Sequence, residues 1–341
     1  MADDVWTTGR VLSWIEGYLG EHGDGTPRVS AQWLVSEALG VSRMQLYLDL
    51  DRPLTADERA VLRDWTRRRA AGEPLQYITG EAGFRHITLR VAPGVLIPRP
   101  ETEVLVSEAL ALLPAAAKPQ DAYEQALLQY LEERGSDVAD DADGGASAEA
   151  ATSATSVEAA ESVVADEESL LLVADICTGS GCIACSIAAE HPGTRVVATD
   201  IAPAAVELAR RNAQELGLAE LITVLECDLG EDVPDELMGA FDLVVSNPPY
   251  IPTAELAQLE QQVAEFEPQL ALDGGVDGLV VFRRLLDWSK QALAPGGACV
   301  FELHETCLDD AAAEADYAGF TDVRIVQDLA GKPRILTARK R

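Results

Sequence analysis

Apolar side chains recur at helical spacing through the first 80 residues, which predicts a small helical bundle. The first stripe consists of Val11, Leu12, Ile15 and Leu19, widened by Trp14 and Tyr18. A second predicted helix carries Trp33, Leu34 and Leu39. A third helix is expected to begin at the capping box of Thr55 and Glu58 and to end at Gly72, with an apolar face of Val61, Leu62 and Trp65.

Three arginines, Arg67 to Arg69, lie near the end of this third helix. Positive charge stabilises the carboxyl end of a helix, so we expect a solvated helix end. Docking of an acidic partner is the alternative. Residues 83–97 then alternate between apolar and polar positions, which predicts a β-hairpin turning at Pro93–Gly94 within a linker over 81–98. A helix from Glu101 to about Leu113 is expected next.

From Leu170 onward, short apolar runs alternate with helical segments, as buried parallel strands do. The runs are LLLVADI, TRVVATD, ITVLECD, FDLVVSN and ACVFEL. Residues 204–216 form an amphipathic pattern that Gly217 is expected to end. The second domain, residues 99–341, is therefore predicted to be an α/β fold with a doubly wound sheet.

An acidic stretch over residues 116–169 interrupts this domain, with 14 acidic residues against Lys118 and Arg134. Its richness in Ala, Ser, Asp and Glu predicts a mostly disordered insertion, with one helix over residues 123–134. We expect a solvated linker, and an acidic interaction tail is the alternative.

The charge balance bears on possible partners. The chain holds 26 Lys and Arg against 58 Asp and Glu, a net charge of −32. Duplex binding requires cations that replace counterions on phosphates, so no stable nucleic-acid partner is expected. No apolar run of about 18 residues is present, and the N-terminus is acidic with no apolar segment after it. We therefore expect no membrane partner and a cytoplasmic location.

The six cysteines lie in the second half of the chain, and Cys177, Cys182 and Cys185 have the spacing C-x4-C-x2-C. This spacing begins a ferredoxin-type pattern, so an iron–sulfur site is one alternative. We expect instead that Cys182 and Cys185 open a helix as small core side chains, with no disulfide and no metal site.

Asp175 to Gly181 follow a predicted strand and open a helix, with glycines at 179 and 181 where a ligand would approach the backbone. Asp200 ends the next strand, where a carboxylate accepts hydrogen bonds from ribose hydroxyls. Taken alone, this pattern also fits a dinucleotide site or a tight turn without a ligand.

Asn247-Pro248-Pro249-Tyr250 follows the strand FDLVVS, at the end of the sheet where α/β proteins bind ligands. The prolines restrict the backbone and keep Asn247 extended. The Asn247 oxygen and nearby carbonyls then form rigid acceptors for a planar NH2 group, and Tyr250 packs on that group. A nicotinamide oxidoreductase would leave this motif unexplained.

The glycine loop, the acidic residue and N-P-P-Y together resemble S-adenosylmethionine-dependent amino-methyltransferases. The segments GEPLQYITGEAGF, VLIPRPETE, NPPYIP, LALDGGVDGL and DLAGKPR further resemble the release-factor glutamine methyltransferases, the HemK family. The resemblance implies a Rossmann-like, seven-stranded class I methyltransferase domain, joined by a β-hairpin to an N-terminal substrate-recognition domain over 1–80. It also implies that the chain methylates the side-chain amide (N5) of the glutamine in the Gly-Gly-Gln motif of class I peptide chain release factors.

The resemblance also implies roles for individual residues. The cofactor would be bound by Cys177, Thr178, Gly179, Ser180, Gly181, Asp200, Asp228, Leu229 and Asn247. The glutamine amide would be clamped by Asn247, Pro248, Pro249 and Tyr250, and Arg99, Pro100 and Glu101 would shape the wall. This chain has Cys177 and His304 where the family often has glycine, and Leu229 where an aromatic residue is common.

The expected reaction is an in-line displacement governed by positioning and desolvation, and no strong general base is needed. Three alternatives stay open. They are a glutamine methyltransferase acting on a ribosomal protein, a nucleic-acid amino-methyltransferase, and a non-catalytic binding module.

Overall fold

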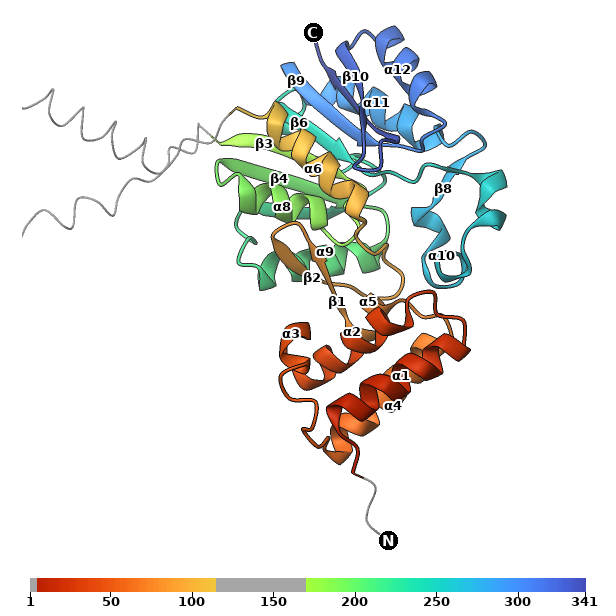
Figure 1. The fold of residues 1–341 in the computed structure, drawn as a ribbon. Helices are drawn as coiled ribbons and strands as arrows, with labels where there is room; N and C mark the ends of the chain where they lie inside the picture. The colour runs from red at the N-terminus through yellow and green to blue at the C-terminus, as the bar shows by residue number, and fades with distance from the viewer. Residues whose placement is uncertain (1–4, 115–169) are drawn as a thin grey trace, which may run out of the picture.

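The computed structural model describes residues 5–114 and 170–341. The N-terminal part is helical, as predicted (Figure 1). Its helices are α1 (Thr8–Glu21), α2 (Pro27–Leu39), α3 (Arg43–Leu46), α4 (Ala56–Ala70) and α5 (Leu75–Thr79). Leu12, Ile15, Leu34 and Leu62 share one buried core. The capping box at Thr55 and Glu58 is confirmed, with both of its hydrogen bonds present.

Two expectations for α4 are wrong. Val61 is exposed, and Leu62 provides the buried contact instead. Arg69 is not solvated, because its guanidinium lies 2.7 Å from the nearly buried carboxylate of Asp24. Arg68 pairs with Glu73. Only Arg67 of the three arginines is exposed, so the cationic end of α4 mainly joins this helix to neighbouring turns.

The β-hairpin exists, but its predicted turn is wrong. Strands β1 (Glu81–Phe84) and β2 (Ile87–Arg90) are antiparallel and turn at Arg85–His86, not at Pro93–Gly94. Arg85 has a φ of 50°, a left-handed conformation that is uncommon for a residue with a side chain. Its guanidinium holds the turn in place, because it contacts Glu190 at 2.6 Å and donates to the backbone oxygen of Glu103.

A seven-stranded sheet forms the second part of the molecule, with the order β10-β11-β9-β6-β3-β4-β5. The strands are β3 (Leu171–Ile176), β4 (Thr194–Asp200), β5 (Ile222–Glu226), β6 (Phe241–Ser246), β9 (Leu293–Glu302), β10 (Thr321–Gln327) and β11 (Pro333–Arg339). The first five of these are mutually parallel where they pair, whereas β11 is antiparallel to both β9 and β10. The five apolar runs and the doubly wound sheet are confirmed.

Alternating strand residues bury the two faces of this sheet under different helices. Val173 and Leu243 belong to one core, and the adjacent Ala174 and Val244 belong to the other. The first face is covered by α6 (Pro100–Leu112), α8 (Cys182–Glu190) and α9 (Pro203–Glu215), and the second by α11 (Val280–Ala292) and α12 (Leu308–Tyr317). Cys182 and Cys185 are buried at the start of α8, as predicted. Within the described residues, no group of His, Cys, Asp or Glu side chains is arranged to hold a metal ion.

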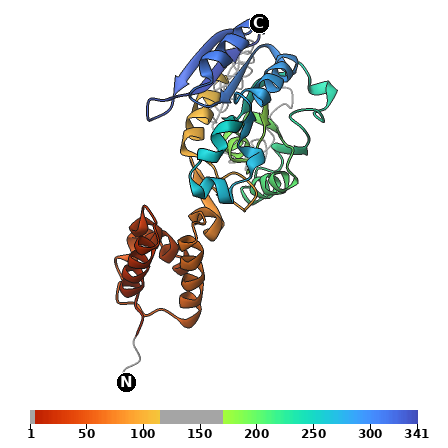
Figure 2. The ribbon, with the colours of Figure 1, turned by 90° about the vertical axis from the view of Figure 1, so that its right-hand side faces the viewer.

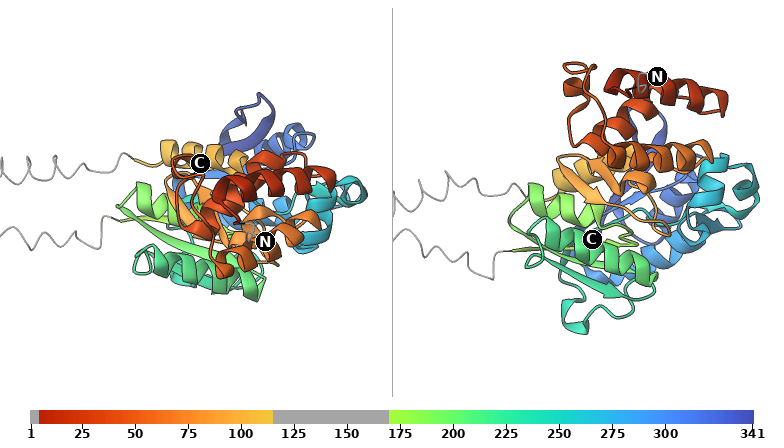
Figure 3. Two further views of the ribbon diagram at one scale, coloured as in Figure 1. Left: turned by 60° about the horizontal axis from the view of Figure 1, so that its bottom comes forward. Right: turned by 90° about the horizontal axis from the view of Figure 1, so that it is seen from below.

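The helical bundle lies beyond the hairpin, on one side of the α/β part (Figures 2 and 3). A segment after β6 extends toward it and consists of β7 (Ile251–Pro252), η3 (Thr253–Gln258), α10 (Gln261–Phe266), η4 (Gln269–Ala271) and β8 (Asp273–Gly275). Phe266 of α10 packs against a buried cluster that includes Tyr77 and Ile97. The nitrogen Nη1 of Arg69 donates to Gln262, so α10 contacts the bundle directly.

The predicted insertion over residues 116–169, with its helix over 123–134, lies outside the described residues. The described residues on either side of this segment, Pro114 and Leu171, are both hydrogen-bonded to the turn at His191–Gly193. His191 donates a ring N–H to the backbone oxygen of Pro114, and the Leu171 amide donates to the backbone oxygen of Gly193. None of the helices in the described ranges is long and apolar enough to cross a membrane.

Candidate active site

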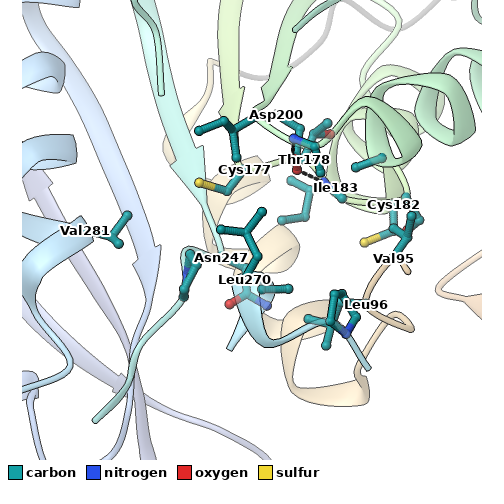
Figure 4. Close-up of a pocket in the computed structure, with 18 of the residues that line it drawn as sticks. Val95, Leu96, Cys177, Thr178, Cys182, Ile183, Asp200, Asn247, Leu270 and Val281 are labelled. Carbon is teal, nitrogen blue, oxygen red and sulfur yellow. Dashed lines mark hydrogen bonds between the residues drawn. The ribbon is translucent and has the colours of Figure 1, made fainter. Parts of the chain in front are cut away.

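A cavity of about 270 Å³ opens at the carboxyl ends of β3, β4 and β6 (Figure 4). The chain leaves β3 toward β4 on one side, and β6 lies on the other, so this is the switch point at which α/β sheets bind ligands. Nine predicted residues line the cavity: Cys177, Thr178, Gly179, Ser180, Asp200, Asp228, Leu229, Asn247 and Pro249. Gly181, Pro248 and Tyr250 are not among its lining residues.

The loop between β3 and α8 depends on unusual backbone angles. Cys177, Gly179 and Gly181 have φ values of 61°, 56° and 79°. A Cβ atom at Gly181 would lie 3.1 Å from the Cβ of Ala209, so α9 also requires a glycine there. Cys177 adopts this conformation with a side chain, and burial raises the pKa of its thiol. The loop therefore presents its backbone to the cavity, and the Cys177 side chain also lies in the cavity wall.

Asp175, the last but one residue of β3, holds this loop from beneath. It is fully buried and accepts from the Thr178 hydroxyl at 2.6 Å and from the Ala184 amide at 3.0 Å through the same oxygen. Its other oxygen has no hydrogen-bond partner among the residues that the structure describes. Burial raises the pKa of Asp175 to about 7, despite these two hydrogen bonds.

Asp200 at the end of β4 has both carboxylate oxygens bound to backbone. Oδ2 accepts from the Gly179 amide and Oδ1 accepts from the Ala202 amide, each at 2.9 Å. Burial raises the pKa of Asp200. The side chain borders the cavity, so the carboxylate both secures the loop and faces a ligand.

Asp228 and Leu229 follow β5, the strand next to β4, and both line the cavity. The Asp228 carboxylate accepts from Nη2 of Arg284 at 2.8 Å, and Arg284 itself lines the cavity. Leu229 has a φ of 51° and its backbone oxygen accepts from the Thr199 hydroxyl. The structure thus brings both predicted residues to the cavity and adds a cation that the sequence did not indicate.

Asn247 and Tyr250 belong to one network of partly buried hydrogen bonds that meet at the buried Glu302. Nδ2 of Asn247 donates to the Thr102 hydroxyl at 3.1 Å, and Thr102 donates to Glu302 at 2.7 Å. The Tyr250 hydroxyl donates to the other oxygen of Glu302 at 3.1 Å. Because the Asn247 nitrogen is bound to Thr102, its oxygen is available to a ligand in the cavity.

Two glycines let the loop around β8 close onto this motif. A Cβ at Gly274 would lie 2.6 Å from the Tyr250 Cα, and one at Gly278 would lie 2.5 Å from the Tyr250 oxygen. Both separations are far below van der Waals contact, so neither position accepts a side chain without displacing Tyr250. The glycines of the segment LALDGGVDGL therefore hold the backbone after Asn247 in place.

The wall near α6 agrees with the expectation for Arg99 but not for Pro100 and Glu101. Arg99 lines the cavity and pairs with the buried carboxylate of Glu267, whose pKa is raised by burial. Pro100 and Glu101 are exposed and are not among the lining residues, because α6 begins there and points them outward. The wall is completed by Pro98 and Thr102.

Three residues at or beside the cavity, Thr102, Glu302 and Arg284, were not predicted from the sequence. Thr102 belongs to the segment VLIPRPETE, which drew attention to the region but not to this hydroxyl. Glu302 lies near the end of the apolar run ACVFEL, and a carboxylate in such a run is a sequence signal that could have predicted it. In the structure its exposed fraction is 1%. Arg284 gives no such signal, because arginine on an amphipathic helix is ordinary. A neighbouring cavity bordered by Tyr250, His304 and Arg334 was also not predicted.

Comparisons with known proteins agree with this arrangement. Residues 10–80 match the family described as PrmC N-terminal domain, and residues 162–290 match the family described as Methyltransferase small domain. The chain is 36% identical to the release factor glutamine methyltransferase of Geobacter sulfurreducens over 98% of both chains. It is also 36% identical to that of Chlorobaculum tepidum, over 96% of this chain and 95% of the relative. Identity to the Rhodopirellula baltica protein of the same name is 33%, over 99% and 98%.

Proposed function

The chain belongs to the release factor glutamine methyltransferases, and we propose that its cavity binds S-adenosylmethionine beside the glutamine of a Gly-Gly-Gln motif in a class I release factor. The fold is a Rossmann-like class I methyltransferase fold with an N-terminal helical part. One observation carries the proposal. At the end of β6, the Asn247 amide is fixed through its nitrogen, so that its oxygen serves as an acceptor in the cavity.

The residues around the cavity fit the cofactor. The buried Ser180 hydroxyl lies in the cavity wall beside the Cys182 thiol, a weak hydrogen-bonding group, so a polar group of a ligand would give it a stronger partner. The Asp200 carboxylate stands where ribose hydroxyls are bound in this fold. Asp228, Leu229, Val281 and Arg284 form the wall that would contact the adenine. When bound, the cofactor supplies a methyl group on a positively charged sulfur.

Asn247 and the prolines position the acceptor amide. The Asn247 oxygen and the adjacent carbonyls accept both N–H groups of the glutamine side chain and orient its nitrogen toward the methyl group. With S-adenosylmethionine bound, this orientation would let the nitrogen bond to the methyl carbon as the carbon–sulfur bond breaks, and the electron pair would stay on sulfur. The methylated nitrogen then loses a proton to water. Positioning accounts for most of the rate, because the amide is a poor nucleophile in solution.

We assign residues 1–80 to substrate recognition, 81–98 to a linker and 99–341, interrupted by 116–169, to catalysis. The helical part supports this division, because it exposes apolar side chains that a protein partner would cover. Met44 and Leu48 are 79% and 81% exposed, and Tyr47 lies between them. A release factor bound to both parts gives more contact area than one glutamine offers. Since this substrate acts in translation, we place the reaction in the cytoplasm.

The direct test is transfer of a labelled methyl group from S-adenosylmethionine to a purified class I release factor. A release factor with Gln→Ala in its Gly-Gly-Gln motif is the control. Label on the wild-type factor alone is expected. If neither factor is labelled while calorimetry shows cofactor binding, the proposed substrate is wrong and ribosomal proteins are tested next. If the cofactor does not bind, the proposed use of the cavity is wrong.

A nucleic-acid substrate would also offer a conjugated NH2 group, but the net charge of −32 opposes a phosphate backbone. Salt-sensitive binding to RNA or DNA would favour that alternative.

A further inference from the structure

Glu302 is a buried carboxylate next to the proposed acceptor site. It ends β9 and is 1% exposed. Each of its oxygens accepts one hydrogen bond, from Thr102 and from Tyr250. No ion pair within the described ranges includes it, although Arg334 acts on it from a distance. Burying a carboxylate without a close cation is costly, so a role beyond packing is indicated.

We propose that Glu302 is a positioning residue for methyl transfer, which orients the Asn247 amide through Thr102 and holds the Tyr250 ring directly. This inference rests on the proposed function, because methyl transfer is its main readout. It joins three segments far apart in the sequence: the start of α6, the motif after β6 and the end of β9.

The direction of the hydrogen bonds explains how Glu302 acts on Asn247. An ionised carboxylate only accepts, so the single hydroxyl hydrogen of Thr102 points to Glu302. The lone pairs of Thr102 then accept from Nδ2 of Asn247. Without the carboxylate, the Thr102 hydroxyl is free to donate to the Asn247 oxygen. The amide would then turn its NH2 toward the substrate NH2, and two donors would face each other.

The same arrangement favours the charge movement of the reaction. During transfer, positive charge moves from the cofactor sulfur to the substrate nitrogen. A chain of hydrogen bonds ending on a carboxylate polarises the Asn247 amide and increases the negative charge on its oxygen. That oxygen contacts the nitrogen that becomes positive, so the stabilisation is greater in the transition state than in the ground state.

Two variants of Thr102 test the orientation. Thr102→Val keeps the shape and removes the hydroxyl, so kcat should fall roughly 10- to 100-fold, as when an outer partner of a functional group is lost. The Kd for S-adenosylmethionine should stay within about threefold of the wild-type value, because the hydroxyl makes no proposed cofactor contact. Thr102→Ser retains the hydroxyl and should restore most of kcat. Thr66→Val, which removes a buried hydroxyl in α4 away from the cavity, is the matched control.

Glu302→Gln tests the charge. Burial raises the pKa of Glu302, against the hydrogen bonds from Thr102 and Tyr250 and the charge of Arg334, while Glu101 adds to the rise. We therefore expect kcat of the wild type to increase with pH as Glu302 ionises. Glu302→Gln should have a lower kcat that lacks this increase. The double variant with Thr102→Val and Glu302→Gln should have a kcat only slightly below that of the more impaired single variant. The reason is that both substitutions interrupt the same chain of hydrogen bonds to Asn247.

A measurement without substrate separates this inference from the proposed function. The side-chain NH2 resonances of Asn247 should shift with pH in the wild type and stay constant in Glu302→Gln. The inference is overturned if Thr102→Val transfers methyl groups at the wild-type rate, or if these resonances titrate equally in both proteins. A wild-type protein that does not label any release factor, but shows the Asn247 titration, rejects only the proposed substrate.

Discussion

The side-chain amide of Asn247 has two partners in the proposed complex. Its nitrogen donates to Thr102, and its oxygen accepts from the substrate NH2 group. Replacing Asn247 with alanine removes the acceptor for the glutamine NH2 while leaving the cofactor loop intact. We expect Asn247→Ala to lower kcat by roughly 100-fold or more, in the range found when one aligned hydrogen-bonding group of a transition-state site is lost. Cofactor affinity should change by less than about fivefold, since Asp200 and the β3–α8 loop remain.

Turnover measured with labelled cofactor, together with calorimetry, checks this expectation. Normal turnover by Asn247→Ala would show that this amide does not position the substrate.

Asp175 gives a prediction about stability and pH. The pKa of its carboxyl rises from 3.8 in the unfolded chain to about 7 in the folded protein, so the folded protein holds its proton more tightly. Its stabilising effect is complete below pH 3.8 and is lost as the pH rises through 7. Asp175→Asn cannot ionise there. Between pH 5 and 8 the wild type should lose about 2–3 kcal/mol of unfolding free energy relative to Asp175→Asn.

Urea unfolding of both proteins at the two pH values provides the measurement. An equal pH dependence in the two proteins would mean that Asp175 is ionised throughout this range.

Cys177 has a side chain in a left-handed conformation, with a φ of 61°. That conformation costs about 1–2 kcal/mol for a residue with a Cβ and little for glycine, although glycine gains entropy in the unfolded state. We expect Cys177→Gly to raise the unfolding free energy by up to about 1 kcal/mol and to keep cofactor binding. Cys177→Val should lower both the unfolding free energy and the affinity for the cofactor, because a β-branched residue is strongly disfavoured at this φ. Thermal unfolding and calorimetry of the two variants decide between these outcomes.

At the scale of elements, β8 and the motif after β6 form one unit, because their backbones touch at Gly274. Gly274→Ala would place a methyl group 2.6 Å from the Tyr250 Cα and force the motif to move. We expect turnover to fall at least tenfold, since small displacements of positioned groups are expensive. Gly83→Ala in β1 is the matched control, because no atom lies within 4 Å of the added methyl group. Equal turnover of the two variants would show that the packing at Gly274 does not support the site.

The elements differ in how far the sequence predicts them. Strands β3, β4, β6 and β9 are mostly buried, so their apolar runs identify them, and the edge strand β5 is identified by its buried Ile222 and Val224. Strand β10 is largely exposed at the edge of the sheet, and TDVRIVQ has no such run. The sequence predicts the hairpin turn at the wrong position because the Pro93–Gly94 dipeptide is typical of turns. The actual turn at Arg85 depends on contacts with Glu190 and Glu103, which are distant in the sequence.

The residues of the site also differ in how far the sequence predicts them. The glycine loop, Asp200 and Asn247 lie in short segments whose spacing indicates their chemistry. Thr102 and Glu302 are 200 positions apart, and only the folded sheet brings the two side chains within hydrogen-bonding distance. No local pattern contains that pairing, so residue spacing alone does not predict the network behind Asn247.

At the scale of the whole molecule, the helical bundle and the α/β part meet through α10 and leave an apolar surface around α3 exposed. If a release factor covers Leu48, Leu48→Asp should raise the KM for that protein roughly tenfold, because a carboxylate would then be buried at the interface. Its unfolding free energy should change by less than about 0.5 kcal/mol, since Leu48 is exposed. Leu329→Asp alters an even more exposed leucine in the α/β part and is the control. An unchanged KM for Leu48→Asp would place the docking surface elsewhere.

The turn at His191–Gly193 also has a practical consequence for protein engineering. Pro114 and Leu171 are both hydrogen-bonded to it, so these two residues lie close together in the folded protein. They adjoin the amino end of β3, whereas the cavity lies at the carboxyl end. Sequence added or removed between the two residues barely alters the loop-closure entropy of the folded core. A reporter domain inserted between Pro114 and Leu171 is therefore expected to leave the cavity open.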